Sequence, residues 1–188
     1  MGNLYVADAA YPHPAVTVYA PGSSKPLRKL TEGITGPTEL AFDPLNNLFV
    51  MNVPVNGTRS IVEYAASSAK VLRNITRGIS SPQAIALDGS GTLYVSNAPF
   101  PSQGWVSVYA PGASTPSYRI TSQMHDPQLL AVDGEGNLYV GNDYYAMPST
   151  ATRHPPAIAE ACVSTRQKPR RPRVAFQTSN TAIRIRWL

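Results

Sequence analysis

Short runs of apolar residues alternate with turn-forming residues along the first 143 positions of the chain. In one representative stretch the runs cover 38–42, 48–51, 60–64 and 71–75, and each is rich in Val, Ile, Leu or aromatic residues. Gly, Pro, Asn, Asp or Ser bounds every run. Short β-branched and aromatic runs with such boundaries are typical of strands joined by tight turns. The pattern therefore predicts four short strands in this stretch.

The same pattern returns every 45 residues. Five residue types recur at this step, namely Pro37, Pro82 and Pro127; Asp43, Asp88 and Asp133; Leu48, Leu93 and Leu138; Val50, Val95 and Val140; and Asn52, Asn97 and Asn142. An earlier copy over 4–8 matches at a step of 44, and the block Val-x-Val-Tyr-Ala-Pro-Gly occurs at 16–22 and again at 106–112. Four antiparallel strands in each 40–45 residues are the unit of a β-propeller, so the repeat predicts propeller blades.

The turns and the first strands carry further signals. Asp43, Asp88 and Asp133 each open a Gly- or Asn-rich turn between the first two strands. An aspartate can accept bonds from the following backbone N–H groups, so we expect these three residues to cap hairpins. Both faces of the first strand are apolar, with Leu40 on one and Ala41 on the other. This pattern predicts a sheet that packs between two neighbouring sheets.

The consensus is Pro-x-x-Leu-Ala-x-Asp-x-x-Gly-Asn-Leu-Tyr-Val-x-Asn, followed by the Val-x-Val-Tyr block. It resembles bacterial NHL-type propeller repeats over about residues 2–143. The resemblance implies that the first strand of each blade lines a central channel and that about six blades close a ring. It implies an architecture and no activity, because propellers of this type include both binding modules and enzymes.

We therefore predict an all-β fold over residues 1–143, an incomplete β-propeller of four-stranded antiparallel blades, followed by an irregular basic tail over 144–188. The predicted parts are a partial blade at 1–31, full blades at 37–76 and 82–121, and a half blade at 127–142. Unclosed end blades expose apolar faces and unpaired strand edges. We expect either self-association that completes a ring or poor solubility.

The basic charge of the chain is confined to its last 45 residues. Residues 1–143 contain eight Lys/Arg and ten Asp/Glu, a net of −2, whereas residues 144–188 contain eight and one, a net of +7. Three interpretations of the tail stay open: translation in a shifted reading frame, a solvated tail, or an arm that neutralises nucleic-acid phosphates. We favour the first, because the composition changes within a blade. The candidate nucleic-acid residues are Arg166, Lys168, Arg170, Arg171 and Arg173.

Candidate ligand-binding residues either recur in every blade or break the repeat. The recurring amides Asn52, Asn97 and Asn142 end their second strands, where they could surround a ligand or bond to nearby backbone groups. Glu39 replaces Ala84 and Leu129 of the other units, and His125-Asp126 stands where the others have Thr35-Gly36 and Ser80-Ser81. A Glu among Asn and Asp ligands is similar to the metal site of gluconolactonase-type propellers. A single blade offers that Glu, so we assign no metal ligand.

The sequence favours a non-enzymatic scaffold for an unidentified protein or small ligand. It contains no recognisable catalytic or nucleotide-binding motif, so we assign no catalytic residue and no cofactor. No apolar run approaches the length of a membrane span, and we expect neither a membrane nor nucleic acid as partner. The N-terminus lacks a signal-peptide pattern, which predicts a cytoplasmic location for this chain, although a longer parent protein could be secreted. Two alternatives stay open: a fragment of a lactonase- or lyase-type propeller enzyme, and nucleic-acid binding through the tail.

Overall fold

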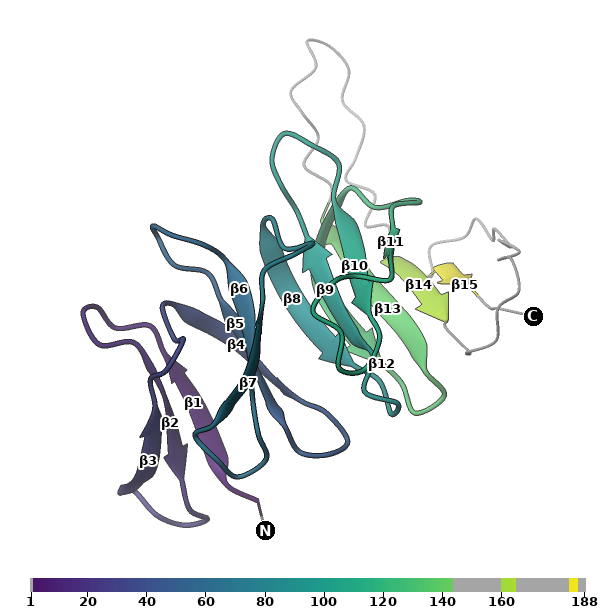
Figure 1. Cartoon of the computed structure of the whole chain (residues 1–188). Helices are drawn as coiled ribbons and strands as arrows, with labels where there is room; N and C mark the ends of the chain where they lie inside the picture. The colour runs from purple at the N-terminus through teal and green to yellow at the C-terminus, as the bar shows by residue number, and fades with distance from the viewer. Residues whose placement is uncertain (1, 144–159, 165–182, 186–188) are drawn as a thin grey trace.

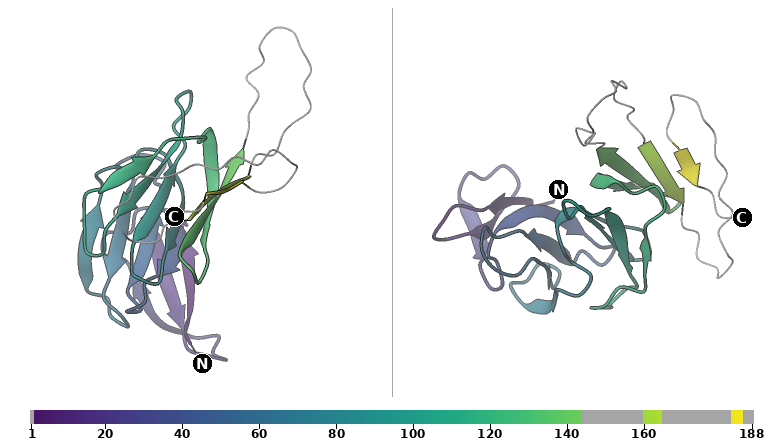
Figure 2. Two further views of the ribbon diagram at one scale, coloured as in Figure 1. Left: turned by 90° about the vertical axis from the view of Figure 1, so that its right-hand side faces the viewer. Right: turned by 90° about the horizontal axis from the view of Figure 1, so that it is seen from above.

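The computed structural model describes residues 2–143, together with the strand paths of 160–164 and 183–185 (Figure 1). The described residues form strands and turns and contain no α-helix, which confirms the predicted all-β class. They make four separate sheets that follow one another in chain order (Figure 2). No sheet closes on itself. No helix among the described residues is long and apolar enough to cross a membrane.

The first two sheets are antiparallel and contain three and four strands. The first consists of β1 (Leu4–Asp8), β2 (Ala15–Tyr19) and β3 (Pro26–Leu30). The second consists of β4 (Pro37–Phe42), β5 (Leu48–Asn52), β6 (Ser60–Tyr64) and β7 (Val71–Ile75). The strands predicted over 60–64 and 71–75 are found with these bounds, and the other two are each longer by one residue.

The third sheet repeats the second, whereas the fourth differs in its outer half. The third consists of β8 (Pro82–Leu87), β9 (Leu93–Asn97), β10 (Trp105–Tyr109) and β11 (Tyr118–Ile120). The fourth consists of β12 (Asp126–Val132), β13 (Asn137–Asp143), β14 (Glu160–Ser164) and β15 (Ile183–Ile185). Strands β14 and β15 pair in parallel and lie within the segment predicted as an irregular tail.

Each pair of successive sheets encloses its own apolar core. The first core joins Val16 and Val18 of the first sheet to Val50 and Tyr64 of the second. The next two cores lie between the second and third sheets and between the third and fourth. Because a strand alternates its side chains between two faces, one sheet supplies both of its neighbouring cores. The alternating apolar pattern thus positions a row of stacked sheets.

The first strands of the four-stranded sheets lie side by side, β4 against β8 and β8 against β12, and β1 lies next to β4. The expectation that both faces of these strands are covered holds for β8, where Ala84, Ile85 and Ala86 are buried. It is wrong for β12, where Leu129 is 69% exposed. The reason is that β8 has a first strand on either side, whereas β12 has such a neighbour on one side among the described residues.

Candidate functional site

The sequence-predicted site residues lie at one edge of the row of sheets. Where the structure describes them, the loops from the second to the third strand and the loops that lead into the first strand meet at this edge, because the strands they follow are antiparallel. We call this the loop edge and the loop before the first strand the entry loop. The loops from second to third strands cover 9–14, 53–59 and 98–104; the entry loops cover 31–36, 76–81 and 121–125.

Asn52 ties the end of β5 to the entry loop of its own sheet. Its side-chain Oδ1 accepts hydrogen bonds from the backbone N–H groups of Thr35 (3.1 Å) and Gly36 (3.3 Å), and its Nδ2 donates to the carbonyl of Gly33 (3.0 Å). The side chain is fully buried. Every described contact of the Asn52 amide therefore goes to the backbone of one loop.

The other two recurring asparagines make the same kind of contact. Asn97 accepts a bond from the backbone N–H of Ser80 (2.8 Å), and Asn142 accepts one from that of His125 (3.2 Å). Asn142 Nδ2 also donates to the carbonyl of Gln123 (3.3 Å). The Oδ1 of each asparagine thus accepts from the backbone of the entry loop, whereas one interpretation of the sequence expected partners in the asparagine's own turn. The Nδ2 of Asn97 donates elsewhere, to the carbonyl of Val95 (3.1 Å) and the hydroxyl of Ser107 (3.4 Å). The three amides belong to three different sheets, and each serves its own.

Glu39 connects two sheets. It follows an irregularity in the pairing of β4 with β5, and its Oε2 accepts a hydrogen bond from the backbone N–H of Ile85 in β8 (2.7 Å). Burial raises the pKa of the Glu39 carboxyl, and the bond from Ile85 opposes that rise without cancelling it. Ile85 N–H lies at the corresponding irregularity of β8, where the ladder with β9 is interrupted. Glu39 therefore supplies an acceptor to the Ile85 N–H at a point where the pairing of β8 with β9 is interrupted.

His125 and Asp126 lie together at the entry to β12. The backbone carbonyl of His125 accepts a bond from Gly104 N–H (2.9 Å) in the preceding sheet. The Asp126 carboxylate accepts one from the side-chain amide of Gln128 (2.6 Å). The structure thus brings His125, Asp126 and Asn142 into one neighbourhood, whereas Asn52 and Glu39 belong to the second sheet.

The recurring aspartates cap the hairpins as predicted. Asp133 Oδ1 accepts bonds from Glu135 N–H and Asn137 N–H, and its Oδ2 accepts bonds from the side chains of Asn137 and Tyr139. These bonds, the one from the Asn137 side chain above all, lower the pKa of Asp133 to about 2. Burial alone would raise the pKa of Asp88, but the bonds from Ser90 and Thr92 outweigh it and lower the pKa. Both carboxylates are therefore committed to their turns.

The recurring tyrosines of the third strands also hold the entry loops, a role that the sequence analysis missed. Tyr109 OH donates to the carbonyl of Arg77 (2.6 Å), and Tyr64 OH donates to the carbonyl of Glu32. Burial raises the pKa of each phenol to about 12. The 45-residue recurrence of these tyrosines was the signal from which their shared role could have been found.

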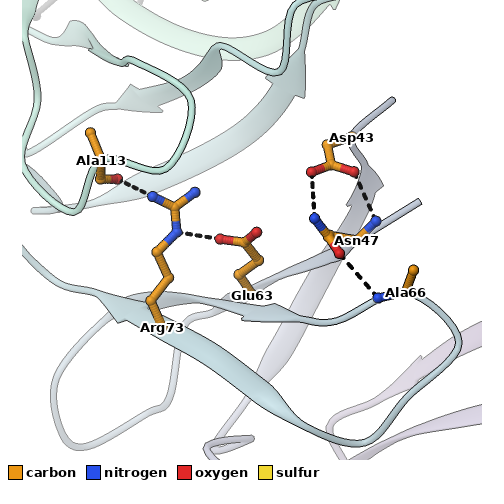
Figure 3. A network of polar contacts seen from close by, with 6 residues as sticks. All are labelled: Asp43, Asn47, Glu63, Ala66, Arg73 and Ala113. Carbon is orange, nitrogen blue, oxygen red and sulfur yellow. Dashed lines mark hydrogen bonds and ion pairs between the residues drawn. The ribbon is translucent and has the colours of Figure 1, made fainter. Parts of the chain in front are cut away.

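Two arginines link neighbouring sheets on their outer strands. Arg73 forms an ion pair with Glu63 and donates from a guanidinium N–H to the carbonyl of Ala113 (2.6 Å) in the next sheet (Figure 3). Arg28, 45 residues earlier, donates in the same way to the carbonyl of Ser67 (2.7 Å). Ser67 lies in the hairpin between β6 and β7, and Ala113 lies in the equivalent hairpin between β10 and β11. The two arginines therefore make a repeated contact between neighbouring sheets.

The residues that the structure describes contain no group of three or more His, Cys, Asp or Glu side chains placed to hold a metal ion. The candidate nucleic-acid residues Arg166, Lys168, Arg170, Arg171 and Arg173 lie outside the described residues. The site geometry thus consists of polar side chains that fasten loops and join sheets. Comparison of the chain with models of known families and with curated proteins finds no match.

Proposed function

We propose that this chain is a segment of an NHL-type β-propeller that acts as a non-enzymatic scaffold for a protein or small ligand. The stacked sheets, the adjacent first strands and the 45-residue step support this proposal. The polar groups with shifted pKa values support the non-enzymatic part, because Glu39, Asp88 and Asp133 are all engaged with backbone or turn groups. Such a frame keeps the loops from the second to the third strands at its surface, where a partner can contact them.

One observation carries the propeller proposal, the open face of the first sheet. Leu4 is 61% exposed and Val6 is 39% exposed. Their counterparts in the other three sheets are all 3% exposed or less: Leu48, Leu93 and Leu138 for the first position, and Val50, Val95 and Val140 for the second. In each of those sheets a preceding sheet covers the two side chains. The open face is therefore complementary to another sheet of the same repeat.

We propose that a second copy of this chain covers this face. The first sheet also lacks the strand that β4, β8 and β12 supply to the others, which leaves an edge of β1 open. Open edges and apolar faces favour association. This proposal keeps the expectation of self-association.

Light scattering over a range of concentrations tests this part of the proposal. We expect the full chain to associate as its concentration rises and the double variant Leu4→Ser/Val6→Ser to remain monomeric. Leu72→Ser removes an exposed leucine from β7 and serves as the control, with association unchanged. A wild-type chain that stays monomeric throughout, or a control that dissociates like the double variant, would overturn the proposal.

An assay of simple lactones separates the scaffold from the alternative of an enzyme fragment. We expect no hydrolysis, because the Glu39 carboxylate is bonded to Ile85 and belongs, among the described residues, to no group of three or more His, Cys, Asp or Glu side chains that could hold a metal ion. Hydrolysis that disappears both with a chelator and in Glu39→Ala would favour the lactonase-type alternative and contradict a non-enzymatic role.

A further inference from the structure

Three large apolar side chains stand out at the loop edge. Tyr11 is 96% exposed, Val55 is 100% exposed and Phe100 is 84% exposed. They lie 44 and 45 residues apart, so each occupies the same position of the repeat, in the loop from the second to the third strand. We call these three residues the apolar tips. A repeated position that is buried in no sheet is not explained by the packing of the sheets.

Prolines flank every apolar tip. Pro12 follows Tyr11, Pro54 precedes Val55, and Pro99 and Pro101 enclose Phe100. Because proline fixes its own φ and restricts the residue before it, these loops have less conformational freedom than ordinary loops of the same length. A loop that is already restricted loses less conformational entropy when it binds a partner. The loops are therefore suited to present their tips.

The three loops that carry the tips lie on the same side of the row, one for each successive sheet. The loops that follow β1, β5 and β9 all extend from the upper side of the row in Figure 1. Stacked sheets lie about 10 Å apart, so the tips are separate points and do not form one continuous patch. A broad apolar partner meets all three at once, whereas a single protein pocket accommodates one side chain. This arrangement favours a lipid surface over a compact protein partner.

The charges near the tips agree with a contact driven by apolar insertion. The loops 9–14, 53–59 and 98–104 contain no Asp or Glu, and Arg59 is their one Lys or Arg. The acidic residues next to these loops are Asp8 at the end of β1, Glu32 in an entry loop, Asp126 at the start of β12 and Asp143 at the end of β13. The loops that carry the tips therefore bring no carboxylate of their own to the lipid, and these three loops lack the cluster of cations that would favour anionic lipids.

We propose that the apolar tips insert into the interfacial layer of a lipid bilayer and hold the loop edge against it. Tyrosine and phenylalanine suit that layer, because their rings are apolar and tyrosine also carries a polar end. The expectation of no membrane partner was drawn from the lack of a spanning segment, which has no bearing on loops that enter one leaflet. This inference goes beyond the scaffold proposal and does not depend on how the sheets are completed.

Co-sedimentation of the full chain with phosphatidylcholine vesicles tests the proposal. We expect the wild type to sediment with the vesicles and Phe100→Ser to weaken partitioning by roughly tenfold or more, as burial of one large apolar side chain predicts. The triple variant Tyr11→Ser/Val55→Ser/Phe100→Ser should remain in the supernatant. Leu45→Ser is the matched control, because Leu45 is 75% exposed in the turn from β4 to β5, at the opposite edge. It should bind as the wild type does.

Salt distinguishes the tips from the basic tail. We expect high salt to leave binding unchanged, because the tips carry no charge, and circular dichroism should show the variants folded as the wild type. Absence of wild-type binding, equal loss in Leu45→Ser, or full binding by the triple variant would each overturn the proposal. Binding that high salt abolishes would instead indicate the basic residues of 166–173 and would likewise overturn it.

Discussion

Replacement of Asn52 by alanine removes the contacts that fix the entry loop of the second sheet. The backbone N–H groups of Thr35 and Gly36 lose their acceptor, and the carbonyl of Gly33 loses its donor. The Gly36 bond is buried, and the other two are partly buried. The variant thus leaves three backbone groups to find other partners in a place that water reaches incompletely.

The expected cost follows from these contacts. A buried polar group without a partner costs about 1–3 kcal/mol, and a partly buried group that water can reach costs less. We therefore expect Asn52→Ala to lower the free energy of unfolding by about 2–4 kcal/mol. Asn142→Ala breaks two longer bonds, at 3.2 and 3.3 Å, and should cost about 1–2 kcal/mol.

Urea denaturation followed by far-ultraviolet circular dichroism measures the change. With an m value of about 2 kcal/mol per molar, the midpoint should fall by roughly 1–2 M in Asn52→Ala. Asn52→Asp keeps an acceptor but loses the donor to Gly33, so it should fall between the wild type and Asn52→Ala. If Asn52→Ala lowers the free energy of unfolding by less than about 0.5 kcal/mol, the reasoning is refuted, because a change of that size is typical of a surface substitution that removes no important contact.

Three further variants each test the contacts of one residue. Burial raises the pKa of Glu39, so the ionised form of its carboxyl is disfavoured in the fold. The stability of the wild type relative to Glu39→Gln should therefore be greatest below pH 4.5, the ordinary pKa of the group, and should fall as the pH rises through the pKa in the folded state. Urea titrations at several pH values measure this difference. Asp133 has a lowered pKa of about 2, so its contribution should be present near neutral pH and lost as the pH falls toward 2, a loss that Asp133→Asn should not show in acid titration. Tyr109→Phe breaks the bond to Arg77 and should cost about 0.5–1.5 kcal/mol, measured by thermal unfolding; an unchanged midpoint would contradict a holding role.

The strands were predictable because their causes are local. The runs at 60–64 and 71–75 carry their own β-forming residues and turn boundaries, and the structure starts and ends β6 and β7 at those residues. The capping role of Asp133 was predictable for the same reason, since its partners lie two to six residues ahead. A local pattern needs no knowledge of the neighbouring sheet.

The contacts between sheets were not predictable in this way. Glu39 bonds to Ile85, 46 residues ahead, and Arg73 bonds to Ala113, 40 residues ahead. Neither pair is visible until the stacking of the sheets is known. The exposure of Leu129 has the same origin, because its surroundings depend on which strands flank β12. Sequence reasoning proposed Glu39 as a ligand residue, and the structure adds that its carboxylate accepts a bond from the backbone N–H of Ile85.

The entry loops have an evolutionary consequence. The loop before β8 is held by Asn97 of β9 and Tyr109 of β10, so both anchors lie within the same 45-residue unit. A copied unit therefore brings the residues that hold its own entry loop. Gene duplication can lengthen or shorten such a chain by whole modules without inventing new loop chemistry.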